Sequence, residues 1–308
     1  MARTATVIAV AVALLLMALS TAATGVYWVP AHEMAPPGGV TAPAACDLDG
    51  DSDYDVSAFE RYPIQHYWNT GSLQVPSWQL DETQFPGLLV CNFRYGAFAD
   101  LNADGDQDLV IGCYYGDLHM YWNIGTPHVP VWQHAPSMFQ GLTVDPKPAP
   151  CLADMDADGD LDLVIATDRG IDQVRYVENT GTATCPAWTY RGVIVGVFFD
   201  VEHHAQVALG DLDGDGDLDM VGSSHGAEVL SWENVGTPQA FQFVESPAML
   251  TGVPGVPQGT HGLALADFNA DGRLDLLIAG SNQNYLYLNE PVTPVDRTSW
   301  SVIKAFYR

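Results

Sequence analysis

A nine-residue pattern rich in aspartate occurs five times in this 308-residue chain and constrains its fold more than any other feature. Successive copies begin 53 to 57 residues apart. Self-similarity at a fixed period of this length predicts a repeat architecture in which each copy marks one supersecondary unit. The copies are DLDGDSDYD (47–55), DLNADGDQD (100–108), DMDADGDLD (154–162), DLDGDGDLD (211–219) and DFNADGRLD (267–275).

The five windows hold more than half of the 38 acidic residues of the chain. Carboxylates crowded in this way raise one another's pKa unless a cation lies among them. Only 11 Lys and Arg oppose the acids, and the formal net charge is −27. Such a balance repels nucleic acid and anionic lipid, so we expect neither as a partner.

The spacing within each window favours calcium. Side-chain oxygens at loop positions 1, 3, 5 and 9, a turn glycine at position 6 and a backbone carbonyl at position 7 can wrap a hard cation. Zinc prefers His or Cys, and magnesium tolerates flexible cages poorly. An EF-hand shares the opening of the pattern but needs a Glu at position 12 on a helix. Four of the windows have Ile111, Ile165, Gly222 and Ile278 there, within strand-like runs.

The rest of each repeat is typical of β-strands. A short run of small apolar residues precedes each loop and a β-rich run follows it; a third strand then ends in Asn-x-Gly at Asn69, Asn123, Asn179 and Asn234, which marks a hairpin turn. A fourth strand carries an aromatic residue, which we expect to pack between neighbouring units. These aromatics are Trp78, Trp132, Trp188, Phe243 and Trp300. Four antiparallel strands in each of five units predict the blades of a β-propeller.

The loops and the strands after them resemble FG-GAP/VCBS repeats, the calcium-loop blades also found in integrin α-subunit propellers and in many exported bacterial proteins. The resemblance implies an all-β propeller of about five four-stranded blades over residues 45–308, with a calcium loop between the first and second strands of each blade and up to five Ca²⁺ ions. It assigns side-chain ligands to Asp47, Asp49, Asp51, Asp55, Asp100, Asn102, Asp104, Asp108, Asp154, Asp156, Asp158, Asp162, Asp211, Asp213, Asp215, Asp219, Asp267, Asn269, Asp271 and Asp275. Position 7 contributes only its carbonyl, from Asp53, Asp106, Asp160, Asp217 and Arg273.

Two loops depart from the pattern. Ser52 replaces the turn glycine in the first loop, and the cationic Arg273 accompanies three carboxylates in the fifth. We expect these two loops to bind calcium most weakly.

The segment 25–44 is expected to supply a closing strand. Trp28 lies 19 residues before Asp47, close to the interval between the other outer aromatics and the next loop. Residues 26–36 are therefore predicted to form an extra outer strand that closes the last blade. We expect residues 299–308 to pair beside this strand or to dock elsewhere. An incomplete ring to which a partner supplies strands is the alternative.

Residues 1–24 have the layout of a secretory signal peptide. Arg3 precedes an apolar run from Val7 to Leu19, and small residues follow. An uncleaved anchor is the alternative, but the run is short for a bilayer span. We expect a secreted or cell-surface protein with no stable membrane span after processing. Export permits disulfides, yet five cysteines leave at least one unpaired or bonded to another chain.

Basic and aromatic residues concentrate, by the usual propeller strand order, on the rim opposite the calcium loops. In so acidic a chain this favours a ligand surface for an anionic or polyhydroxyl partner, although variable loops also carry polar residues without binding anything. The candidate ligand-binding residues are Arg61, Arg94, Tyr95, Tyr114, Arg169, His204, His225 and His261.

We therefore expect a non-catalytic binding or adhesion module for a glycan or an extracellular protein. The alternative is a polysaccharide lyase with His204 or His261 as the base and Arg94 or Arg169 neutralising a uronate. A surface protein that serves only in assembly is a third interpretation. The sequence contains no G-x-S-x-G, P-loop or H-E-x-x-H motif, and we assign no catalytic residue.

Overall fold

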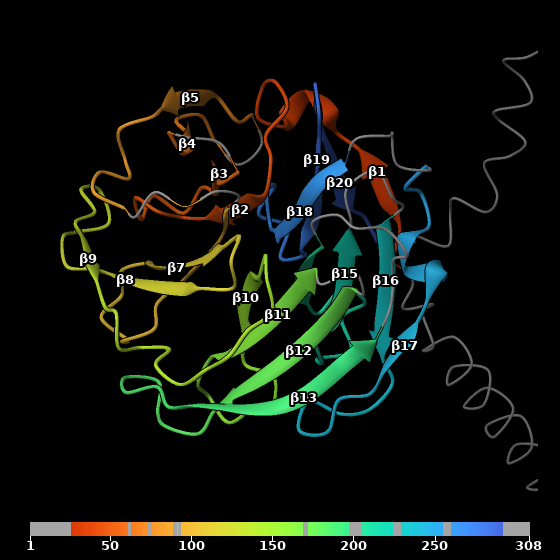
Figure 1. Cartoon of the computed structure of the whole chain (residues 1–308). Coiled ribbons are helices and arrows are strands. Elements are labelled where there is room, and N and C mark those ends of the chain that lie inside the picture. The colour runs from red at the N-terminus through yellow and green to blue at the C-terminus, as the bar shows by residue number, and fades with distance from the viewer. Residues whose placement is uncertain are drawn as a thin grey trace, which may run out of the picture.

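The protein is an all-β propeller of five four-stranded antiparallel sheets arranged around a common axis (Figure 1). It is seen in a computed structural model that describes residues 26–60, 63–72, 75–88, 91, 94–168, 172–196, 205–223, 229–254 and 260–291. Within these residues the only helices are two short 3₁₀ turns, η1 (His32–Met34) and η2 (Pro247–Leu250). The expected fold class is confirmed.

Four blades are built from consecutive strands, because hairpin turns join each strand to the next. Blade 1 is β2 (Pro43–Cys46), β3 (Asp55–Ala58), β4 (Gln65–Asn69) and β5 (Trp78–Asp81). Blade 2 is β6 (Arg94–Ala99), β7 (Asp108–Cys113), β8 (Leu118–Asn123) and β9 (Trp132–His134). Blade 3 is β10 (Ala149–Ala153), β11 (Asp162–Asp168), β12 (Asp172–Asn179) and β13 (Trp188–Gly196). Blade 4 is β14 (Gln206–Gly210), β15 (Asp219–Ser223), β16 (Val229–Asn234) and β17 (Phe243–Glu245).

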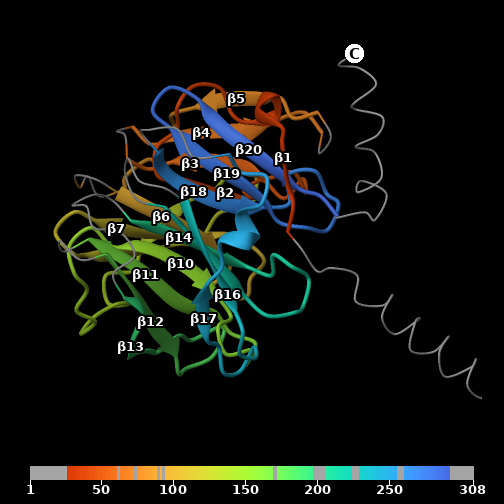
Figure 2. The same cartoon turned by 90° about the vertical axis from the view of Figure 1, so that its right-hand side faces the viewer.

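The fifth blade combines the two ends of the chain. It contains β18 (Thr260–Ala266), β19 (Asp275–Gly280) and β20 (Asn284–Asn289), and its outer strand is β1 (Trp28–Pro30). Trp28 pairs with Asn289 in antiparallel register, and Figure 2 shows β1 beside β20. The N-terminal strand therefore closes the ring from within the chain. Trp300 and residues 299–308 lie outside the described residues.

The first strands of the five blades surround the axis, and each contacts the first strand of both neighbouring blades. A cavity of about 350 Å³ lies among them. Close approach of the blades depends on glycine at Gly96, where a Cβ would lie only 2.3 Å from the ring of Phe59 in blade 1. The second strands β7 and β19 are buried along their whole length. The buried apolar residues form five clusters, the largest of which contains residues of blades 1 to 4.

The outer-strand aromatics pack between blades. The indole Nε1 of Trp78 donates to Met34 O (3.0 Å), that of Trp132 to Gln84 O (2.9 Å), and that of Trp28 to Met249 O (2.6 Å). Each acceptor lies just after the outer strand of the preceding blade. These tryptophans satisfy their polar group while burying a large apolar surface, as expected for buried indole rings.

One disulfide is present, between Cys91 and Cys113. Cys46, Cys151 and Cys185 are free. In the part of the chain that the structure describes, no helix is long and apolar enough to cross a membrane.

Candidate metal centres and a surface groove

Each aspartate window forms a tight loop between the first and second strands of its blade. Backbone N–H groups of the loop donate hydrogen bonds to the carboxylate at position 1. Asp47 Oδ1 accepts the N–H groups of Gly50 (2.8 Å) and Asp51 (3.1 Å), while its Oδ2 accepts that of Ser52 (3.0 Å). The bond from position 6 to position 1 recurs in all five loops, as does a bond from the N–H of position 7 to the side chain at position 5. The side chains at positions 1 and 5 are therefore turned into the loop.

The carboxylate at position 9 anchors the loop to the third strand. One of its oxygens accepts the N–H of position 2, and the other accepts the N–H of the asparagine that ends the third strand, in every blade. These carboxylates are at most 1% exposed. Two backbone bonds leave further lone pairs on each carboxylate for a cation.

Burial raises the pKa of every position-9 carboxyl, although its backbone hydrogen bonds act in the opposite direction. The pKa of Asp55 rises to about 8, those of Asp108, Asp219 and Asp275 to about 7, and that of Asp162 to about 6. Desolvation disfavours the charged form unless a positive charge is near. A cation in the loop would reverse this effect.

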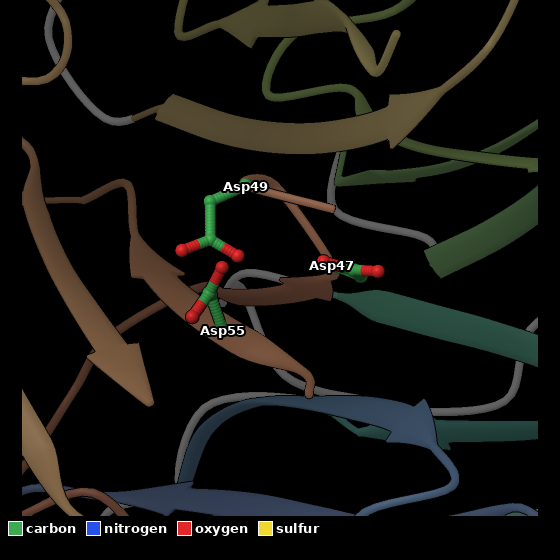
Figure 3. A group of neighbouring side chains, drawn as sticks. All are labelled: Asp47, Asp49 and Asp55. Atoms are coloured by element: carbon green, nitrogen blue, oxygen red, sulfur yellow. The ribbon is translucent and has the colours of Figure 1, made fainter. Parts of the chain in front are cut away.

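In three loops the acidic ligand atoms at positions 1, 3 and 9 lie within 4.8 Å of one another. Figure 3 shows the first of these clusters, in which Asp49 and Asp55 point toward one another. The clusters are Asp47, Asp49 and Asp55; Asp154, Asp156 and Asp162; and Asp211, Asp213 and Asp219. The second and fifth loops have an amide at position 3, where Asn102 and Asn269 each donate to the aspartate at position 5.

Three carboxylate oxygens in the third and fourth loops are buried and have no hydrogen-bond partner among the described residues. They are Oδ1 of Asp156, Asp160 and Asp217. Buried anionic oxygens without a partner are costly, and they are the groups that a hard cation satisfies. The residues present therefore fit calcium.

Position 7, to which the sequence assigned only a backbone carbonyl, also carries a buried carboxylate in three loops. The side chains of Asp53, Asp160 and Asp217 are 6–8% exposed, and burial together with the neighbouring loop carboxylates raises the pKa of each, that of Asp217 to about 6. The signal was present in the sequence, because four of the five loops have aspartate at this position.

The two loops that depart from the pattern are also distinct in the structure. Ser52 takes the left-handed conformation (φ 77°) that glycine adopts at position 6 of the other four loops. Arg273 is exposed in the fifth loop.

Few residues of the expected ligand face can be placed. Tyr114 lies in the β7–β8 turn, with the Lys147 Nζ atom 5.5 Å from its ring centre. Tyr95 is only 3% exposed and belongs to the core cluster that contains residues of blades 1 to 4. Arg94 and His261 belong to β6 and β18, and their side chains are outside the description. Arg61, Arg169, His204 and His225 lie outside the described residues.

A surface groove of about 440 Å³ lies between the segment that follows β9 and the start of β13. No charged side chain is among the described residues that line it. Tyr190 is 50% exposed at its edge, and Arg175, which is paired with Asp145, lies 5.9 Å from the centre of the tyrosine ring. The lining residues are Met138, Phe139, Gln140, Gly141, Leu142, Thr143, Trp188 and Tyr190. Sequence reasoning missed this groove because its two walls lie more than 40 residues apart.

A closed ring of five blades with an acidic loop at the same corner of each blade defines a repeat-built β-propeller with candidate cation sites. The sequence matches the FG-GAP-like repeat over residues 100–165, 154–222 and 211–278, which together span more than half of the chain. The chain belongs to this family. No curated protein matches it.

Several solved structures are similar to this chain. The endo-arabinase of Bacteroides thetaiotaomicron has 11% identity and a TM-score of 0.53, covering 87% of this chain and 97% of that one. A lectin of Agrocybe aegerita, described as recognising non-reducing terminal N-acetylglucosamine, has 19% identity and a TM-score of 0.41, covering 82% of this chain. This chain spans 64% of the length of that lectin. The fucose-specific lectin of Aleuria aurantia has 10% identity and a TM-score of 0.43, covering 76% of this chain and 69% of that one. Likeness at these identities concerns the fold alone.

Proposed function

We propose that this protein is an exported, non-catalytic saccharide-binding module whose propeller is held rigid by calcium. The observation that carries the binding function is the uncharged aromatic groove beside β13. Trp188 and Tyr190 supply ring faces, and Gln140 and Thr143 supply neutral polar groups that can donate and accept hydrogen bonds. Apolar pockets of a few hundred cubic ångströms with a few polar groups are typical ligand sites.

The uncharged lining selects the ligand class. In a chain of net charge −27, an anionic ligand meets long-range repulsion wherever no basic side chain offsets it. A neutral pyranose has apolar C–H faces that suit exposed aromatic rings and hydroxyls that suit amide and hydroxyl partners. Of the anionic or polyhydroxyl partners expected from the basic residues of the opposite rim, most of which lie outside the described residues, this groove favours a neutral polyhydroxyl one.

Calcium would be held in each loop by side-chain oxygens of positions 1, 3, 5 and 9 and by backbone at position 7. It supplies charge compensation, and the residues of the loop supply the geometry. The buried Oδ1 atoms of Asp156 at position 3 and of Asp160 and Asp217 at position 7 support a cation in these loops, because a buried anionic oxygen needs a positive partner. We propose an extracellular location on the basis of the signal-like N-terminus and the Cys91–Cys113 disulfide, since disulfides persist mainly in oxidising compartments.

A glycan array tests the binding function, with the best neutral ligand then measured by calorimetry. Tyr190→Ala should weaken that ligand at least about tenfold, because one stacked aromatic ring in a binding site contributes more than about 1.4 kcal/mol. Tyr115→Ala is the matched control, since Tyr115 is 77% exposed and lies outside the groove. If no glycan on the array binds, saccharide binding is contradicted. If the protein releases unsaturated products from uronate polymers, the lyase alternative is favoured.

A further inference from the structure

Two histidines lie close together on one face of blade 2, away from the aspartate loops. His119 belongs to β8, and His134 is the last residue of β9. His134 pairs with Tyr121 across the two strands, and His119 lies two residues before Tyr121, so the three side chains share one face. The centres of the two imidazole rings are 5.4 Å apart. Diagonal neighbours in an antiparallel pair can make such contacts when their side chains are aromatic.

The imidazole of His134 packs on Tyr121 but has an unsatisfied nitrogen. The two ring centres are 5.0 Å apart, and Tyr121 is only 2% exposed. The Nε2 atom of His134 is buried and has no hydrogen-bond partner among the described residues. A buried polar atom without a partner is costly, and a metal ion is one partner that satisfies an imidazole nitrogen.

The surroundings of His119 favour a metal ligand. Burial lowers the pKa of His119, and the neighbouring imidazole of His134 lowers it further. Neutral imidazole is the form that binds metal ions. The carboxylate of Asp117, which opposes these two effects, also acts on His119 and supplies a negative charge that attracts a cation.

The separation of the two rings suits one ion bound to both. Zinc is bound tetrahedrally with Zn–N distances of about 2.0–2.1 Å, which places the centres of two ligating imidazoles roughly 5 Å apart. The observed separation is 5.4 Å. Imidazole suits zinc, copper and nickel, whereas calcium takes oxygen ligands. The chemistry of this pair therefore differs from that of the aspartate loops.

We propose that His119 and His134 bind one Zn²⁺ or Cu²⁺ ion, which clips the outer strand β9 to β8. Strand β9 has only three residues, so a link through its last residue adds a constraint that few backbone hydrogen bonds supply. The segment that walls the surface groove leaves the blade directly after His134, and the ion fixes the point from which it starts.

Titration of the full chain with zinc chloride tests the site, in excess calcium so that calcium competes for the aspartate loops. The protein should bind one Zn²⁺ at this site. His119→Gln and His134→Gln should each weaken zinc at least about tenfold, because even the loss of a residue that only orients a metal ligand costs about 10–100-fold. His128→Gln is the matched control and should leave the zinc affinity unchanged, since His128 is exposed in the turn between β8 and β9.

Thermal unfolding supplies a second readout. Zinc at about 100 times its Kd should raise the Tm of the parent protein by roughly 5 °C and should raise that of neither histidine variant. If His134→Gln does not fold, because its ring packs on Tyr121, His119→Gln decides the question by itself.

The proposal is overturned if the parent protein binds no zinc, or if His119→Gln binds zinc as tightly as the parent, which would place the ion elsewhere. Electron paramagnetic resonance with Cu²⁺ should show two imidazole nitrogens on the ion in the parent protein and one in His119→Gln. None of these outcomes bears on saccharide binding.

Discussion

Removal of calcium is expected to destabilise this propeller by most of its folding free energy. The three loops with clustered carboxylates at positions 1, 3 and 9 should bind most tightly. With a Kd of about 10 μM in about 1 mM calcium, each site contributes about 2.7 kcal/mol, and three contribute about 8 kcal/mol. Whole domains are stable by only about 5–15 kcal/mol. At about 2 °C per kcal/mol for a chain of this size, Tm should fall by roughly 15 °C in excess chelator.

The assay is thermal unfolding followed by circular dichroism, on protein shown to be metal-free by elemental analysis and then on the same protein with calcium or magnesium restored. Calcium should recover the lost Tm and magnesium should recover little of it, because magnesium demands a more rigid octahedral site. Asp211→Ala should remove one bound ion per chain, whereas Asp117→Ala, an equal change of charge in an exposed turn, should remove none. An unchanged Tm in metal-free protein would refute the reasoning that these loops are structural cation cages.

Two further predictions follow from the loops. In metal-free protein, stability should decrease as pH rises from about 4 to about 8, because burial raises the pKa of Asp55 to about 8 and that of Asp108 to about 7, so the folded state binds more protons than the unfolded state in this window. With calcium bound, stability should instead increase as pH rises, because protons compete with the ion for the carboxylates at low pH. Chemical denaturation at pH 5 and pH 8, with and without calcium, measures both pH dependences. Equal stabilities at the two pH values in metal-free protein would contradict the reasoning. Ser52→Gly should raise stability by about 0.5–1 kcal/mol and tighten the first calcium site, since Ser52 occupies a left-handed conformation (φ 77°) that costs a non-glycine residue about 1 kcal/mol. Calorimetric titration with calcium measures the second effect, and a weaker first site in the variant would count against it.

Local pattern was enough to predict the blades. The recurring aspartate loop, the Asn-x-Gly turn and the outer aromatic each depend on residues within one unit, and their period of about 55 residues counts the units. The Trp78 and Trp132 side chains lie between blades as their spacing predicted. Such features can be inferred from a sequence because hairpin turns and loop hydrogen bonds involve neighbours in the chain.

Burial of particular side chains depended on the packing of one blade against the next. Tyr95 was expected on the ligand face, yet it packs in the core, because strand direction alone does not tell which face of a blade meets its neighbour. At loop position 7 the side chains of Asp53, Asp160 and Asp217 are buried, although the sequence assigned only the backbone of this position to the site. The groove beside Tyr190 formed only when the segment after β9 came to lie along β13.

The sequence by itself thus determined the number of blades, the place of each acidic loop and the candidate ligands, since all three follow from periodicity within the chain. The tertiary structure alone decided which of the five cysteines pair, since Cys91 bonds to Cys113 and the other three are free. A disulfide needs two Cβ atoms at close range, and that geometry depends on how the chain folds within blade 2, which the spacing of the cysteines does not tell.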